Sequence, residues 1–169
     1  VAVLLFHSVQ PEASGKAIMS VNEFDQVLTA IKENGYNFIS SDQFHRYMKG
    51  TLQLPSKSVM ITFDDGYEDN LIYAYPVLVK HQAPAIIFLV TKWYSPNPRP
   101  EKHLPHLTFS QINYLASRGL VAFGGHSHDG HYLTNESKEP IMIARLPGES
   151  NQRYQRRVSN DFRACRMQL

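Results

Sequence analysis

The segment SVMITFDDGYEDN, residues 58–70, joins an apolar run directly to two adjacent carboxylates and a glycine. Its apolar part, residues 58–63, is typical of a buried strand because it is short and continuous. Asp64 and Asp65 repel each other, and each carboxylate costs free energy when it leaves water. Either the pair lies in an exposed Asp-Gly turn, or a cation at the strand end offsets both costs.

The composition is that of an ordinary globular domain. The 169 residues are 43% hydrophobic and 19% charged, which is sufficient for one core and argues against disorder. The net charge of +2 is too small to indicate a nucleic-acid partner, and the arginines within residues 145–166 predict a solvated helix face. Cys165 is the only cysteine, which excludes an internal disulfide and a multi-cysteine zinc site. No apolar run approaches the roughly 20 residues of a membrane span.

Strand patterns and helix patterns alternate along the chain. Strands are predicted at the short apolar runs, which are residues 1–6, 36–40, 58–63, 83–91 and 120–125. A polar stretch, residues 7–16, follows the first run.

Helix starts are predicted by capping boxes, in which a serine or threonine precedes a glutamate or glutamine by three positions. These are Ser20 with Glu23 and Thr108 with Gln111. Further helices are predicted at residues 41–50, at residues 69–82 with Pro76 inside the helix, and at residues 154–169.

The alternation predicts an α/β fold of parallel strands with helical crossovers, either a barrel or a doubly wound sheet. In both architectures the working groups lie at the carboxyl ends of the strands. Imidazole and carboxylate side chains follow three of the predicted strands: His7, Asp64, Asp65, His126, His128 and His131. Their convergence on one face disfavours the exposed-turn interpretation of the aspartate pair.

Such a set of side chains limits the chemistry to a few alternatives. One carboxylate and two imidazoles leave coordination positions open on a divalent ion, where bound water becomes a nucleophile near neutral pH. A second carboxylate beside the ion can take the proton of that water. The ion would also relieve the repulsion between Asp64 and Asp65. Zinc, nickel, cobalt and iron all suit an Asp-His-His set, so the metal identity stays open.

Two motifs carry a resemblance to a known family. TFDDGY at residues 62–67 and HSHDGH at residues 126–131 resemble the motifs of NodB-type polysaccharide deacetylases, carbohydrate esterase family 4. Members of that family remove acetyl groups with the help of a divalent metal. The resemblance implies that Asp64 is the general base and that Asp65 is a metal ligand.

The spacing of the histidines narrows the resemblance. The metal-binding histidines of the broad family are four residues apart, whereas His126 and His131 are five residues apart. This spacing looks like that of the poly-β-1,6-N-acetylglucosamine deacetylases of PgaB/IcaB type, which also have an early histidine that matches His7. The resemblance therefore implies His126 and His131 as ligands, and His7 is the candidate for protonating the leaving amine. His128 could replace a neighbour as ligand, but a solvent-facing loop position is favoured.

For the fold, the resemblance implies a distorted (β/α)7-type barrel. Family members usually continue past a final amphipathic helix to a proline-aromatic-glycine motif and to later strands. Neither feature precedes the end at Leu169, so we expect residues 1–169 to be a deacetylase domain truncated at its C-terminal end, with an incomplete barrel.

The function implied is removal of N-acetyl groups from poly-β-1,6-N-acetylglucosamine of a biofilm matrix, with release of acetate, in the periplasm or at the cell surface. Chitin oligomers, peptidoglycan and xylan are alternative substrates. A non-catalytic glycan-binding or export module with a vestigial metal site is an alternative of another class. The oligomeric state is left open.

Several aromatic and histidine side chains near the strand ends have two interpretations. Tyr67, Trp93 and Tyr132 could stack on sugar rings, or they could be ordinary packing residues. His103 and His106 could reach the site on a mobile loop, but the surface of the loop is the favoured position.

Overall fold

A computed structural model describes residues 1–13, 15, 17–94, 104–135 and 137–169. Its centre is a parallel sheet in which neighbouring strands follow the order β1, β5, β6, β7, and β4 also pairs with the start of β5. The strands are β1 (Ala2–Phe6), β4 (Asn37–Phe38), β5 (Ser58–Phe63), β6 (Ala85–Val90) and β7 (Val121–Ser127). The α/β class and the five predicted strands are thereby confirmed.

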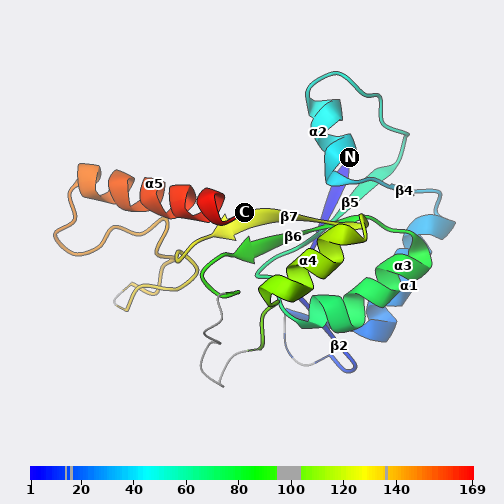
Figure 1. Cartoon of the computed structure of the whole chain (residues 1–169), viewed down its shortest axis with the longest axis horizontal. Coiled ribbons are helices and arrows are strands. Elements are labelled where there is room, and N and C mark those ends of the chain that lie inside the picture. Colours follow the sequence, from blue (N-terminus) through cyan, green and yellow to red (C-terminus); the bar gives the residue numbers. More distant parts are fainter. Residues whose placement is uncertain (14, 16, 95–103, 136) are drawn as a thin grey trace.

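Five α-helices connect or flank these strands: α1 (Val21–Glu33), α2 (Ser41–Met48), α3 (Tyr75–His81), α4 (Phe109–Ser117) and α5 (Asn151–Gln168). Figure 1 shows α1, α3 and α4 gathered on one side of the sheet, with α5 beyond the β7 end. Both predicted capping boxes form, at the starts of α1 and α4. Within the part of the chain that the structure describes, no helix combines the length and the apolar character that crossing a bilayer requires.

The strand of the opening segment, β5, lies in the middle of the core. All six of its residues are buried, including the polar Ser58 and Thr62, so the strand does not alternate between buried apolar and exposed polar residues. The ring of Phe63 lies 5.7 Å from that of Phe24 in α1, and Phe6 of β1 lies 5.1 Å from Phe24. Burying a side chain of this size contributes roughly 1.5–3 kcal/mol, so the core holds the carboxyl ends of β1 and β5 side by side.

The polar stretch at residues 7–16 contains a strand that its local pattern does not indicate. This strand, β2 (Ser8–Gln10), forms a small parallel sheet with β3 (Ile18–Ser20), which follows the stretch. Ser8 and Val9 are buried, and the hydroxyl of Ser8 donates to Oδ2 of Asp69 over 2.6 Å. This long-range partner orders a stretch that looks like a loop when it is considered locally.

The helix predicted at residues 69–82, with Pro76 inside it, is confirmed, because the chain is helical from residue 69 to residue 81. Its first part is a π-helical turn, η1 (Asn70–Ala74), and its α-helical part, α3, begins at Tyr75 with Pro76 in the first α-helical turn. Pro76 has no N–H to donate to the preceding turn. It therefore lies where the helix changes from π to α geometry.

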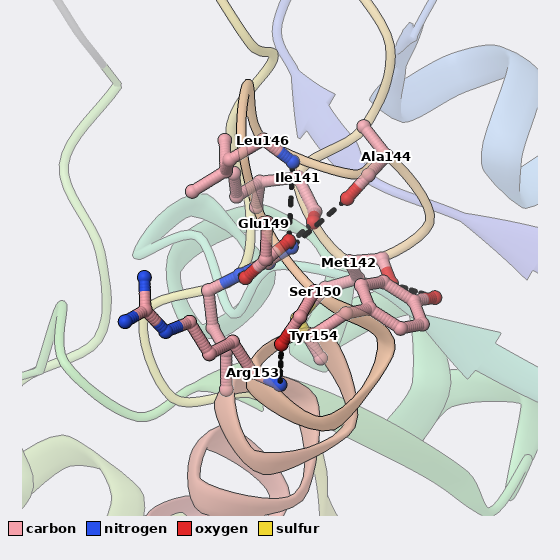
Figure 2. Close-up of polar contacts among 9 residues, drawn as sticks. Ile141, Met142, Ala144, Leu146, Glu149, Ser150, Arg153 and Tyr154 are labelled. Atoms are coloured by element: carbon pink, nitrogen blue, oxygen red, sulfur yellow. Dashed lines mark hydrogen bonds and ion pairs between the residues drawn. The ribbon is translucent and has the colours of Figure 1, made fainter.

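Helix α5 holds the long connection that follows β7 (Figure 2). The guanidinium group of Arg157 donates to the carbonyls of Ile141 (2.7 Å) and Ala144 (2.9 Å) and to both carboxylate oxygens of Glu149. The hydroxyl of Tyr154 donates to the carbonyl of Met142 over 3.0 Å. The solvated helix face expected for the arginines is therefore wrong for Arg157, which is only 25% exposed along its side chain.

This arrangement predicts a pH-dependent contribution of Glu149 to stability. The Arg157 guanidinium lowers the pKa of Glu149 from its usual 4.5 to about 2. A carboxyl group with a lowered pKa stabilises the folded state above its unfolded pKa, and this contribution disappears as the pH falls through the folded pKa. The melting temperature of Glu149→Gln should therefore lie furthest below that of the natural protein above about pH 5, and the gap should close toward pH 2.

Thermal melts across this pH range would test the prediction. Glu12→Gln, at an exposed carboxylate, is the matched control and should show no comparable gap. A gap for Glu149→Gln that stayed constant with pH would show that the Arg157 ion pair is not its cause.

Candidate metal centre

The aspartate pair lies in a tight turn at the carboxyl end of β5. The amide of Asp64 donates to the carbonyl of Phe6 over 2.9 Å, which continues the pairing of β5 with β1. Asp65 and Gly66 both have a φ of +72°. This conformation is costly for an aspartate, and such strain is typically maintained at functional sites. The carbonyl of Gly66 accepts from the amide of Leu107, so the loop before α4 holds the turn.

Gly66 is required here for two reasons, its positive φ and its close approach to β6. A Cβ at this position would lie 2.5 Å from Cδ2 of Leu89. We expect Gly66→Ala to lower the free energy of unfolding by roughly 2–5 kcal/mol, as the sum of left-handed strain and overpacking. Gly119→Ala is the matched control, because Gly119 has a φ of +74° and nothing within 4 Å of its added Cβ.

Chemical denaturation of both variants would separate the two causes. Gly119→Ala should lose only the roughly 1–2 kcal/mol of left-handed strain. Equal losses in the two variants would mean that the Leu89 contact relaxes without cost.

A β-bulge presents the first histidine. Along β6 and β7, Leu89 pairs with Gly125, but the next residue, Val90, pairs with Ser127. The register therefore skips His126, which is the extra residue on β7. Bulges of this kind change the direction of a side chain and are common beside active sites.

Three side chains meet at this end of the sheet: Asp65, His126 and His131. Oδ1 of Asp65 lies 3.2 Å from Nε2 of His131 and 3.8 Å from Nε2 of His126. Nε2 of His126 and Nδ1 of His131 lie 3.2 Å apart. One potential ligand atom from each residue lies within 4.8 Å of the other two.

The donor set fits a divalent cation. Asp65 is only 4% exposed along its side chain, and its Oδ1 makes no hydrogen bond within the described residues. Leaving a buried carboxylate oxygen unpaired is costly, and a cation would remove that cost. His126 and His131 are 28% and 42% exposed, so the site opens toward solvent on the histidine side. Asp64 lies beside the group, with Oδ2 3.9 Å from Nδ1 of His126.

Comparison with known families agrees with this geometry. Residues 51–163 match the family model described as polysaccharide deacetylase. The chain belongs to the polysaccharide deacetylase family. Members of this family are hydrolases, and the Asp65, His126 and His131 group is a candidate metal site of this deacetylase chain.

Individual relatives support the assignment over most of the chain. The chain is 31% identical over 164 residues to the poly-β-1,6-N-acetyl-D-glucosamine N-deacetylase of Escherichia coli strain K12, covering 89% of this chain and 24% of that protein. It is 28% identical to the Staphylococcus aureus MRSA252 protein of the same name, covering 83% of this chain and 47% of that protein. The chain thus spans about a quarter of the length of the Escherichia coli protein and just under half of the length of the Staphylococcus aureus protein.

The solved structure of a de-N-acetylase from Aggregatibacter actinomycetemcomitans matches with a TM-score of 0.84 and 27% identity, covering 97% of this chain and 71% of that one. This match confirms the expected fold class, the distorted barrel of deacetylase domains.

Two histidines of the deacetylase lie outside the metal-binding group. The expectation that His128 faces solvent is wrong, because its Nδ1 hydrogen-bonds with the hydroxyl of Thr91 over 2.9 Å. His7 lies between β1 and β2, and its carbonyl accepts from Nδ2 of Asn70 over 2.8 Å. His7 directly follows Phe6, whose carbonyl accepts from the amide of Asp64. The role of His7 as an acid stays a prediction.

Two of the three expected aromatic residues lie near the metal-binding group. The ring of Trp93 is 5.4 Å from that of His131 and 4.6 Å from that of His106, and Tyr67 is 4.9 Å from His106. Tyr132 is 54% exposed and lines a separate open cavity of about 420 Å³. The stacking roles of Tyr67, Trp93 and Tyr132 stay predictions.

The favoured surface position of His106 is wrong, and the alternative position near the site is the one observed. The ring of His106 packs between Tyr67 and Trp93, and His106 pairs with Tyr67 as an isolated bridge. The neighbouring Leu107, which is fully buried, is a signal that this part of the loop returns to the core. His103 lies outside the described residues.

Asp69 and Asn70, at the end of the segment 58–70, help to hold the site in place. Asp69 accepts from the hydroxyl of Ser8, and Asn70 donates to the carbonyl of His7, so both residues hold the stretch that follows β1. Burial raises the pKa of the Asp69 carboxyl, and the hydrogen bond from Ser8 opposes that shift. The polarity of Asp69 and Asn70 suggests a surface turn, whereas both residues are buried.

Proposed function

We propose that this deacetylase chain removes N-acetyl groups from poly-β-1,6-N-acetylglucosamine and releases acetate. The observation that carries the proposal is the buried Asp65 carboxylate, whose Oδ1 faces His126 and His131 without a hydrogen bond within the described residues. The choice of polymer rests on the curated relatives of that name and on the histidine spacing that the chain shows.

Each residue has a proposed role. Asp65, His126 and His131 would hold a divalent cation, which could be zinc, nickel, cobalt or iron. When bound, such a cation supplies a Lewis acid that polarises a carbonyl oxygen and acidifies water.

The proton transfers are assigned to Asp64, which lies beside the metal-binding group, and to His7. Asp64 takes the proton of the water that attacks the acetyl carbonyl carbon, through a carboxylate that is 17% exposed. His7, in its protonated form, gives a proton to the amine nitrogen as the C–N bond breaks. Tyr67, Trp93 and Tyr132 offer ring faces on which sugar rings of the polymer stack.

The family resemblance of the motifs supports a location outside the cytoplasm. We propose that the protein is located in the periplasm, at the cell surface or in the surrounding medium, in association with the cell envelope. This location is the one that the resemblance to the family implies. The polymer of a biofilm matrix is then its partner.

Measurement of acetate release would test the proposal. Defined β-1,6-linked N-acetylglucosamine oligomers, β-1,4-linked chitin oligomers, peptidoglycan and acetylated xylan should each be offered to purified protein, with and without a chelator. We expect release from the β-1,6-linked oligomers, loss of release with chelator and recovery on addition of metal. Faster release from another substrate would overturn the polymer assignment. Glycan binding without acetate release in metal-loaded protein would instead support a non-catalytic module.

A further inference from the structure

We infer that Asp161 of α5 is a positioning residue for the loop that carries the metal-ligand histidines. This inference rests on the proposed metal centre. His126 is the second-last residue of β7 and His131 follows five residues later, so the four residues between them set how the two rings face each other. Asp161 is the side chain that holds the middle of this loop.

The carboxylate of Asp161 accepts from two consecutive main-chain amides. Its Oδ1 lies 2.9 Å from the amide nitrogen of His128, and its Oδ2 lies 2.7 Å from that of Asp129. Hydrogen bonds to an ionised carboxylate are shorter and about twice as strong as those between neutral groups. One side chain, 32 residues further along the chain, thus fixes the peptide planes between the two ligands.

The loop is shaped for this contact. An added Cβ at Gly130 would lie 2.4 Å from Sδ of Met142 and 3.4 Å from Oδ1 of Asp161, so a larger residue would have to displace the Met142 side chain. Met142 is itself held by α5, because its carbonyl accepts from the hydroxyl of Tyr154. The loop therefore lies against a surface that α5 has already ordered.

The face of α5 that carries Asp161 also contacts β7. Tyr154, Arg157, Asp161 and Cys165 follow at steps of three and four residues, which places them on one side of the helix. At the far end, a Cβ at Gly125 would lie 2.4 Å from Sγ of Cys165. Contacts on both sides of Asp161 thus fix the position of its carboxylate relative to β7.

The consequence concerns His131 in particular. This side chain is 42% exposed, so burial alone does not determine its position beside Asp65. Residues that orient metal ligands from outside the coordination sphere typically change metal affinity by roughly 10- to 100-fold when they are mutated. Without Asp161, two amides of the loop lose their acceptors and His131 loses its fixed distance from Oδ1 of Asp65.

Cobalt(II) titration would test this role, because the visible absorption of bound cobalt reports the geometry of its ligands and needs no substrate. The variants are Asp161→Ala and Asp161→Asn, the second of which keeps one acceptor and the side-chain volume. We expect roughly 10- to 100-fold weaker cobalt affinity and an altered cobalt spectrum for Asp161→Ala. Asp161→Asn should lie between this variant and the natural protein.

Asp25→Ala is the matched control for a merely structural effect. Asp25 is also a carboxylate with partners on another helix, since it accepts from Lys80 and contacts Nε2 of His81 at 2.6 Å, which links α1 to α3. Its loss should lower the melting temperature and leave cobalt affinity and spectrum as in the natural protein.

The outcomes separate this inference from the proposed function. If both Asp161 variants bound cobalt with the affinity and the spectrum of the natural protein, only the positioning role would be overturned. Equal loss of affinity in Asp25→Ala would also overturn it, because the effect would then follow general stability. A natural protein that binds no cobalt would overturn the metal centre itself, and this inference with it.

Discussion

An Asp65→Asn variant is expected to lose bound metal and deacetylase activity together. The asparagine oxygen is neutral and is therefore a poorer donor to a dication than the carboxylate that it replaces. Asp65 is only 4% exposed, so water cannot readily take its place between the imidazoles. We expect metal affinity to fall by more than the roughly 10- to 100-fold that is typical of residues outside the coordination sphere.

Metal analysis of the purified variant, beside an acetate-release assay, would measure this effect. The matched control is Asp129→Asn, which alters a 48% exposed carboxylate of the histidine loop that forms an ion pair with Lys92. This control should keep its metal. Full metal occupancy in Asp65→Asn would exclude Asp65 from the ligand set.

An Asp64→Asn variant is expected to keep its metal but lose turnover. The carboxylate of Asp64 lies 3.9 Å from His126 and beside the metal-binding group, so its charge is not needed to hold the cation. As the proton acceptor, however, it should contribute about 10²- to 10⁴-fold to the rate. We therefore expect near-normal metal content and a loss of activity of this size.

Comparison of the two variants decides which carboxylate has which role. Near-normal turnover in a metal-loaded Asp64→Asn protein would remove the base from the mechanism. Equal metal loss in Asp64→Asn and Asp65→Asn would mean that both carboxylates are ligands. The natural protein treated with chelator provides the reference for complete metal loss.

The sequence alone determined the elements that depend on short-range patterns. The buried run of β5, the capping boxes at Ser20 and Thr108 and the amphipathic pattern of α5 each involve residues a few positions apart. The fold class followed from their alternation. The convergence of aspartate and histidine side chains could also be predicted, because the carboxyl ends of parallel strands meet at one edge. The choice of Asp65, His126 and His131 among them came from the family resemblance of the two motifs.

Only the tertiary structure decided which side chains hold this group in place. The ring of His128 turns to Thr91, 37 residues away, and the carboxylate of Asp161 reaches its amide from 33 residues away. Asp69 orders β2 from 61 residues away, and the bulge at His126 exists only as a register between two strands. Such partners leave no local periodicity, because a hydrogen bond between distant residues depends on where packing brings them, not on their spacing along the chain.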